Sequence, residues 1–291
     1  VANGSSTKID TDSYPDPLRQ FNATWSPDSK WITYSKNLAS HLRAIFVYSW
    51  ADKKSYQITD GLADSISPTF DAGGKYLYFM ASTNYGPSTG WLEMSSLDRP
   101  VRRAIYLVVL SATDPSPLLP ETGDEPKPPD PAAPKPDPNA KPAVRMDVDG
   151  IGQRILAVNV PAGDYGNLTS GAAGTFFYTE PFVPGTPGTM RLQRYQLKDR
   201  AAAPFLEGSI RSYSVSADKK KLLYQAGDGA NRWGVVATER PAKVGDGPLN
   251  VAQLEMRVDP RAEWAQIYRE TWRIQREYFY DPKMHGADWQ A

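Results

Sequence analysis

The chain has 291 residues, and its 33 Lys and Arg side chains balance 33 Asp and Glu, so its formal net charge is zero. Such a balance gives no electrostatic case for binding nucleic acid or an anionic membrane surface. Cysteine is absent, which excludes disulfides and thiolate metal sites, and no apolar run approaches the length needed to span a bilayer.

The N-terminus, Val1-Ala2-Asn3-Gly4, carries neither an initiator Met nor a signal peptide. A fragment boundary explains this and would remove any targeting signal of a parent protein. The lack of cysteine fits a reducing compartment, so we expect a cytoplasmic protein, with the periplasm as the alternative.

The first recognisable unit follows a predicted loop over residues 1–20. Ser26-Pro27-Asp28-Ser29-Lys30 predicts a tight turn, because Pro sets φ and Asp can bond its own backbone. Directly after it, the alternation of Trp31 and Thr33 with Ile32 and Tyr34 predicts a strand with two different faces.

This turn-and-strand unit returns along the chain. The whole unit recurs at Phe70–Phe79 and Val215–Tyr224, and the strand alone recurs at Gly174–Tyr178. The equivalent positions Ile32, Leu77, Phe176 and Leu222 lie 45, 99 and 46 residues apart. Each copy is followed by another alternating strand, predicted at Ala44–Tyr48, Ala104–Val109, Arg191–Tyr195 and Trp233–Val236. Short strands repeating roughly every 40–45 residues indicate the blades of a β-propeller.

The Ser-Pro-Asp-x-Lys turn with its strand resembles the blades of the TolB-like and tricorn propellers. We therefore predict an all-β fold, a partial propeller of about four blades over residues 1–256. The second propeller of the tricorn family has about seven blades, so the resemblance implies that others precede Val1. A closed four-bladed ring is the alternative.

The long interval between Leu77 and Phe176 holds a segment of unusual composition. Residues 115–142 contain 11 of the 26 prolines, among acidic residues and lysines. This composition cannot bury enough apolar surface to offset the entropy of ordering, so we predict a disordered surface insert between blades. A linker between two separate folds is the alternative. An insertion before a stretch like Val148–Ile155 also resembles tricorn-like bacterial proteins.

A single helix is predicted near the C-terminus. Asp259 is a suitable N-cap, Pro260 is tolerated at the first helical position, and Asp281-Pro282 ends the pattern. Trp264, Tyr268 and Trp272 stand four residues apart, which stacks them along one side. A helix face with these aromatic side chains is expected to be buried against another part of the protein.

The run from Arg261 to Trp289 resembles the opening of the catalytic half of tricorn-type serine peptidases. It reads Arg-x-Glu-Trp-x-x-Ile-Tyr at its start and Met-His-Gly-x-Asp-Trp at its end. The resemblance implies that residues 257–291 begin a truncated catalytic half, and that the propeller is a conduit or filter for peptides.

Three sequence features invite a catalytic interpretation. Gly86-Pro87-Ser88-Thr89-Gly90 matches the nucleophile elbow, but that elbow needs a strand before it and a helix after it. His41 has no recognisable serine and acid nearby, and His285 follows the helix, whereas the family's catalytic histidine lies further along the chain. We predict a hairpin tip for Ser88, a surface position for His41 and local hydrogen bonds for His285.

Asp147-Val148-Asp149-Gly150 is similar to half a calcium loop, but the remaining acidic ligands of an EF-hand are missing, so a turn is predicted. We therefore assign no catalytic, cofactor-binding or metal-binding residue within the chain, and no cofactor. The resemblance implies a parent that degrades oligopeptides, carries a PDZ-like domain and forms a homo-oligomer, with no nucleic-acid or membrane partner. A stand-alone TolB-like propeller that binds proteins without enzymatic activity is the alternative.

Overall fold

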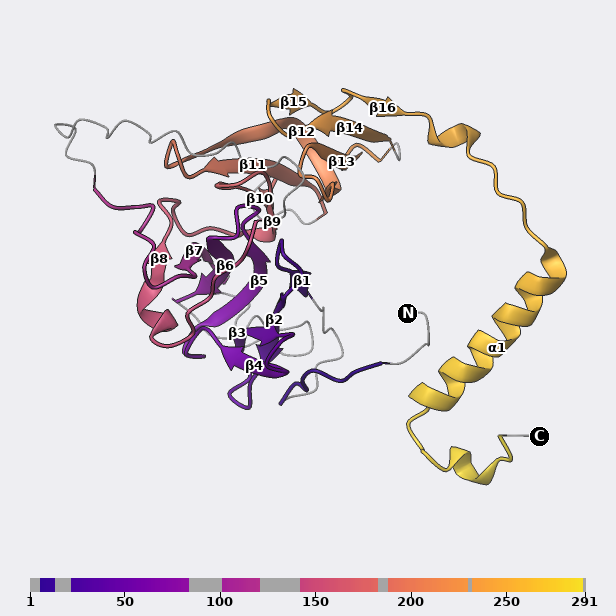
Figure 1. The fold of residues 1–291 in the computed structure, drawn as a ribbon. Coiled ribbons are helices and arrows are strands. Elements are labelled where there is room, and N and C mark those ends of the chain that lie inside the picture. The colour runs from indigo at the N-terminus through magenta and orange to yellow at the C-terminus, as the bar shows by residue number, and fades with distance from the viewer. Residues whose placement is uncertain are drawn as a thin grey trace. The chain divides into compact units, whose positions relative to one another are not determined.

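The computed structural model describes residues 6–13, 22–83, 101–120, 142–182, 188–229 and 232–289. The chain divides into two compact units, Val1–Leu249 and Asn250–Ala291. The first holds the strands and the second holds the α-helix (Figure 1). Within the described ranges, no helix combines the length and apolar character that crossing a bilayer requires.

Two four-stranded antiparallel sheets, in which strand order follows chain order, form the first two blades. The first blade consists of β1 (Thr24–Trp25), β2 (Trp31–Asn37), β3 (Arg43–Ser49) and β4 (Lys54–Gln57). The second consists of β5 (Asp64–Phe70), β6 (Tyr76–Ser82), β7 (Ala104–Val109) and β8 (Ile155–Ala157), the last preceded by the 3-10 turn η1 (Ile151–Arg154).

The third and fourth blades belong to one continuous sheet. The third consists of β9 (Gly166–Ser170), β10 (Thr175–Pro181), β11 (Met190–Gln196) and the first part of β12 (Ala201–Val215). The fourth continues with the rest of β12, β13 (Lys221–Ala226), β14 (Trp233–Ala237), β15 (Ala242–Lys243) and β16 (Pro248–Leu249).

The strand β12 is the outer strand of one blade and the inner strand of the next. Its residues 201–206 pair with β11, and its residues 210–215 pair with β13. Gly208 lies between these stretches with φ of 115°, a value that a residue with a Cβ rarely adopts. A Cβ at that position would also lie 2.9 Å from Cγ2 of Val244.

The predicted all-β fold of propeller blades is confirmed. The equivalent positions Ile32, Leu77, Phe176 and Leu222 all lie in the second strand of their blades and are all buried. The strand predicted over Ala104–Val109 has those bounds. The other strands that were predicted to follow each copy of the unit fall within β3, β11 and β14.

The same turn precedes the second strand of each blade. Ser29, Gly74, Gly174 and Lys219 occupy equivalent positions before the second strand, and their φ angles of 61°, 74°, 71° and 62° are all left-handed. Glycine adopts this conformation without strain, and Ser29 and Lys219 adopt it within turns closed by hydrogen bonds to Ser26 and Ser216.

An aspartate within the turn links one blade to the next. The Asp28 carboxylate accepts a hydrogen bond from Ser26 Oγ at 2.6 Å and another from the Val144 N–H of the second blade at 3.0 Å. The Asp71 carboxylate accepts one from the Gly174 N–H of the third blade at 2.7 Å. Partly buried backbone donors are thereby satisfied across two blade boundaries.

The core lies between blades, as the two faces of β6 show. Leu77 and Phe79 pack with Ile45 and Val47 of the first blade. Tyr78 and Met80 point to the other face and pack with the third blade, where Tyr78 lies 4.9 Å from the ring of Phe176. Strands buried on both faces therefore read as continuous apolar runs.

The second unit contains η2 (Val251–Gln253), the helix α1 (Pro260–Tyr278) and η3 (Met284–Gly286). Asp259 caps the helix as predicted, because its side chain accepts hydrogen bonds from the backbone N–H groups of Arg261 and Ala262. The helix ends at Tyr278, three residues before Asp281-Pro282. Trp272 stacks on Trp289 with ring centroids 6.2 Å apart, whereas Trp264 and Tyr268 are exposed.

Of the predicted insert at 115–142, residues 121–141 lie outside the described part of the chain. The preceding residues are folded against the propeller. Leu118 packs on the core between the second and third blades, and the Leu119 carbonyl accepts a hydrogen bond from Arg200 at 2.6 Å. The structured blade therefore extends into the first residues of the proline-rich segment.

Candidate functional site

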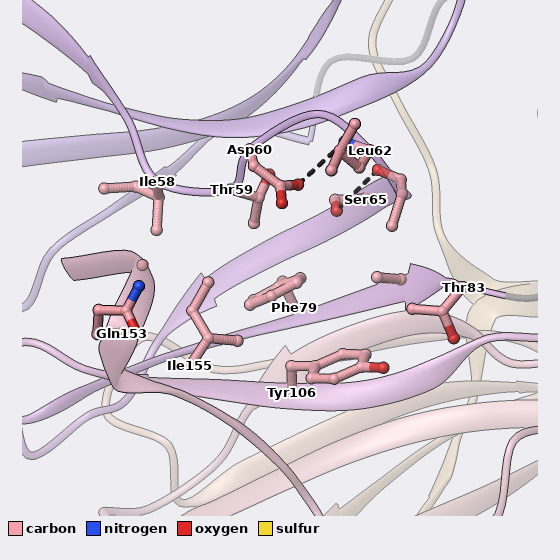
Figure 2. Close-up of a pocket in the computed structure, with 13 residues that line it drawn as sticks. Ile58, Thr59, Asp60, Leu62, Ser65, Phe79, Thr83, Tyr106, Gln153 and Ile155 are labelled. Carbon is pink, nitrogen blue, oxygen red and sulfur yellow. Dashed lines mark hydrogen bonds between the residues drawn. The ribbon is translucent and has the colours of Figure 1, made fainter. Parts of the chain in front are cut away.

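A cleft of about 510 Å³ opens between the first and second blades. One wall is the connection from β4 to β5, and the other comes from β6, β7 and the η1–β8 segment. Figure 2 shows Asp60 and Ser65 on one side, facing Phe79, Tyr106 and Ile155 on the other. The cleft thus continues the packing boundary between two blades to the surface.

The floor of the cleft is apolar. The rings of Phe79 and Tyr106 stack across β6 and β7, with centroids 5.4 Å apart and planes 18° apart. Ile58, Ala81 and Ile155 complete this surface. Phe79 is buried and Tyr106 is partly buried, so the floor is fixed by packing while one ring remains accessible.

Polar groups surround this floor, and some of them serve the fold. Thr59 Oγ1 accepts a hydrogen bond from the Ile45 N–H at 2.9 Å, and Ser65 donates to the Ala63 carbonyl at 3.3 Å. Asp60 Oδ1 accepts from the Leu62 N–H at 2.9 Å, which orients the carboxylate.

Other polar groups at the cleft have capacity left for a ligand. Within the described residues, no hydrogen bond engages the Tyr106 hydroxyl or the Gln153 side chain, and Asp60 has no ion-pair partner. Among the described residues that line the cleft, Asp60 is also the only charged one. An apolar floor with a few convergent polar groups is the usual make-up of a ligand site.

A buried ion cluster lies beside the cleft at the start of β5. Asp64 is 1% exposed and accepts from Nε of Arg43 at 2.8 Å and from its NH2 at 2.6 Å. Arg103 approaches the same carboxylate at 3.4 Å, and its buried Nε has no acceptor among the described residues. Burial raises the pKa of Asp64, but the hydrogen bonds and charge of Arg43 outweigh this and hold it below the ordinary value. For Arg103, whose charged form is the protonated one, burial instead lowers the pKa.

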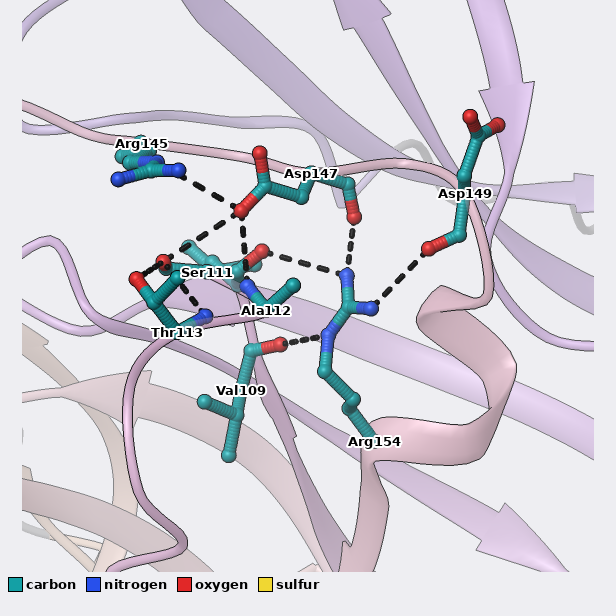
Figure 3. Close-up of polar contacts among 9 residues, drawn as sticks. Val109, Ser111, Ala112, Thr113, Arg145, Asp147, Asp149 and Arg154 are labelled. Atoms are coloured by element: carbon teal, nitrogen blue, oxygen red, sulfur yellow. Dashed lines mark hydrogen bonds and ion pairs between the residues drawn. The ribbon is translucent and has the colours of Figure 1, made fainter.

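A second polar network shows what the Asp147–Gly150 segment does. Figure 3 shows the Arg154 guanidinium among backbone carbonyls, where it donates to those of Val109 at 3.0 Å and Asp149 at 3.1 Å, and also to that of Asp147. The Asp147 carboxylate accepts from the Ala112 N–H at 2.8 Å, and this bond holds the pKa of Asp147 below its ordinary value.

These contacts fasten the chain that returns from the insert onto the end of β7. The segment is therefore the predicted turn. Across the described residues, no group of three or more His, Asp or Glu side chains is arranged to hold a metal ion.

Of the candidate catalytic positions, His41 belongs to the first compact unit and His285 to the second. Ser88 lies outside the described residues. His41 is in the turn between β2 and β3, with φ of 66° and its N–H on the Leu38 carbonyl at 2.9 Å. His285 is in the second unit, where its N–H donates to Asp281 at 2.8 Å and its Nε2 contacts the Tyr280 hydroxyl. The local hydrogen bonds predicted for His285 are present.

The residues of the cleft were not singled out from the sequence. The sequence marks Tyr106 only as part of an alternating strand, and it gives Asp60 no distinguishing feature. Gln153 lies 93 residues beyond Asp60. Only the folding of the second blade brings these side chains together, so no local spacing marks the site.

Comparison with known proteins identifies the source of the repeats. A family model described as the tricorn protease second beta propeller domain matches residues 1–233, and one described as the tricorn protease C1 domain matches residues 260–291. A crystal structure of the tricorn protease superposes on 96% of this chain with a TM-score of 0.69 and 18% identity, and this chain covers 26% of it.

Curated relatives agree with these matches. Tricorn protease homolog 1 of Streptomyces coelicolor is 28% identical over 92% of this chain and 26% of its own length. The tricorn protease of Thermoplasma acidophilum is 24% identical over 89% of this chain and 23% of its own length. The chain thus spans about a quarter of the length of these relatives. Because the propeller match covers most of the residues, and the blades occupy the residues that it covers, the chain belongs to the tricorn protease family.

Proposed function

We propose that this chain is the non-catalytic propeller portion of a tricorn-like serine peptidase that degrades oligopeptides. The observation that carries the proposal is the order of the two matched segments: blades over residues 1–233, then the start of the C1 domain over residues 260–291. A stand-alone protein-binding propeller has no need of the second segment.

The arrangement of potential catalytic groups supports a non-catalytic role. A serine peptidase needs a histidine base that contacts both the nucleophile and an acid. The Nε2 atom of His285 contacts a tyrosine, and no serine is among the contacts that His285 makes with the described residues. The nucleophile, its base and the acid are therefore proposed to lie in the catalytic half of the parent, beyond the part that this chain represents.

For the propeller itself we propose the role of a conduit or size filter. The blades are held together by side-chain packing, because both faces of β6 pack against neighbouring blades. A rigid scaffold of this kind can admit an extended peptide and exclude a folded domain.

Hydrolysis of fluorogenic tri- and tetrapeptides tests the catalytic part of the proposal. The 291-residue chain is expected to show no hydrolysis, and the full-length parent is expected to show hydrolysis that a serine-directed inhibitor stops. Activity of the isolated chain that disappears in Ser88→Ala or His285→Ala would contradict the assignment.

The filter is tested on the parent with one cleavable sequence in two settings. As a free unstructured peptide the sequence should be cleaved, and inside a stable folded domain it should resist. Equal cleavage rates would rule out selection by size.

A further inference from the structure

The cleft between the first and second blades combines three features suited to a ligand. The Asp60 carboxylate has one oxygen engaged, by the Leu62 N–H, and no cation beside it. The Tyr106 hydroxyl and the Gln153 carboxamide have no hydrogen-bond partner among the described residues. Beneath them lies the stacked pair Phe79 and Tyr106.

Each feature restricts the ligand. The stacked rings favour a flat or branched apolar group, because aromatic faces contribute most of their affinity through burial. The single negative charge favours a cation or a strong N–H donor at Asp60. The Tyr106 hydroxyl can both accept and donate a hydrogen bond, which suits a peptide group.

An amino-terminal peptide residue meets all three requirements. In a residue with an apolar side chain, the side chain and the α-ammonium are both attached to the same Cα, and the first peptide group follows directly. A lysine side chain fits less well, because its ammonium lies several bonds from any apolar branch. Its charge would then lie over the rings and not beside Asp60.

We propose that this cleft binds the amino-terminal residue of an oligopeptide, with the α-ammonium on Asp60, the side chain on the accessible ring of Tyr106 and the first peptide group on the Tyr106 hydroxyl. This inference rests on the proposed function, since it supplies a peptide contact for the conduit. No Lys, Arg or His is among the described residues that line the cleft, so the proposal assigns no contact to the carboxyl end.

Binding to the isolated 291-residue chain tests the site, followed by NMR chemical-shift changes on titration with short peptides. Phe-Gly-Gly and its carboxamide are expected to bind equally. N-acetyl-Phe-Gly-Gly, which lacks the ammonium, and Gly-Gly-Gly, which lacks the apolar side chain, are expected to bind at least about tenfold more weakly. Equal binding of the acetylated peptide would overturn the proposal without any substitution in the protein.

Two variants locate the contact. Asp60→Asn should weaken Phe-Gly-Gly about tenfold and leave the acetylated peptide unchanged, and Tyr106→Phe should weaken both peptides several-fold. Asp199→Asn, the same change in the exposed turn between β11 and β12, is the matched control and should bind like the wild type. Full affinity in Asp60→Asn would place the peptide elsewhere.

The outcome separates this site from the proposed function. If the parent hydrolyses peptides but its isolated propeller shows no preference for a free amino terminus, only the site is wrong. If the propeller shows that preference and the parent hydrolyses nothing, the peptidase assignment is wrong and the peptide site stands.

Discussion

Asp71 and Asp218 stand in corresponding turns of the second and fourth blades, yet their surroundings differ. Asp71 is 2% exposed and accepts hydrogen bonds from Gly73, Gly174 and Tyr78. Burial raises the pKa of Asp71 above its ordinary value despite these bonds. Asp218 is exposed and accepts only from Ser216 and Lys220 of its own turn, which holds its pKa below the ordinary value.

The difference predicts unequal costs for the same substitution. Asp71→Asn should lower the free energy of unfolding by about 1–3 kcal/mol, because the amide cannot accept from both Gly73 and Gly174 and leaves a buried N–H unpaired. Asp218→Asn should change it by less than about 0.5 kcal/mol, because it lies on the surface. Urea melts of both variants compare the two values, and equal losses would show that Asp71 does not tie the second blade to the third.

The Arg43–Asp64 pair gives a prediction for pH. Because the pKa of Asp64 is lowered in the folded protein, ionised Asp64 stabilises the fold above the ordinary value of 3.8. That stabilisation is lost as pH falls below 3.8 through the folded pKa.

Arg43→Lys removes the paired geometry and should cost about 1–2 kcal/mol at neutral pH. The difference from wild type should shrink in melts below pH 3.8, where Asp64 becomes protonated. Arg232→Lys, at an exposed pair with Asp228, is the control and should show no such trend. A difference that stays constant as the pH falls would mean that Asp64 does not supply the pH dependence.

At the scale of elements, the strands could be predicted because their turns repeat. The Ser-Pro-Asp and Asp-Ala-Gly turns mark the second strand of a blade through residue types that tolerate left-handed φ. The helix could be predicted because Asp259 and Pro260 each have one strong positional preference.

The continuity of β12 could not be predicted in the same way. Its first half, Ala201-Ala202-Ala203-Pro204, lacks the β-branched and aromatic residues that mark strands. It is a strand because β11 supplies a partner along residues 201–206, while the parallel strand β15 pairs only with Leu206 and Glu207. The cleft was equally hidden, since its residues share no local pattern.

The second unit predicts a separation of effects. Trp272 is held within that unit by stacking on Trp289 and by a hydrogen bond from its Nε1 to the Trp289 carbonyl at 3.0 Å. Trp272→Ala should barely shift the melting of the β-structure in this chain. It should destabilise the full-length parent by about 3–5 kcal/mol, where we expect the aromatic side of the helix to be buried.

Circular dichroism at β-sheet and helix wavelengths follows both transitions in parallel melts. Leu222→Ala, in the core between the third and fourth blades, is the comparison and should lower the β transition by about 2–5 kcal/mol. An equal loss from Trp272→Ala in the chain and the parent would mean that the helix is stabilised by the propeller alone.

At the scale of the whole molecule, the repeat survives an interruption by the proline-rich segment. Leu118 and Arg154 hold the two ends of that interruption on the second blade. We therefore expect the second blade to keep its fold without residues 121–141.

Replacing residues 121–141 with a Gly-Ser linker of half the length should leave the melting of the β-structure nearly unchanged. Halving a flexible loop alters the closure free energy by only about 0.6 kcal/mol. The control keeps the segment but changes Leu118 to Ala, which removes a packed side chain and should be more destabilising. A large loss from the linker alone would show that the proline-rich residues contribute to the core.

The shared strand β12 also determines which blades can separate from each other. The third and fourth blades are joined there by covalent backbone and by ladders on both sides, so they can part only if the strand itself breaks its pairing. The first and second blades meet through side chains, the Asp28–Val144 bond and the Arg43–Asp64 pair, and their boundary already opens into a cleft. Local opening should therefore occur at the boundary between the first and second blades. Hydrogen exchange should be faster in the connection from β4 to β5 than anywhere along the middle of β12.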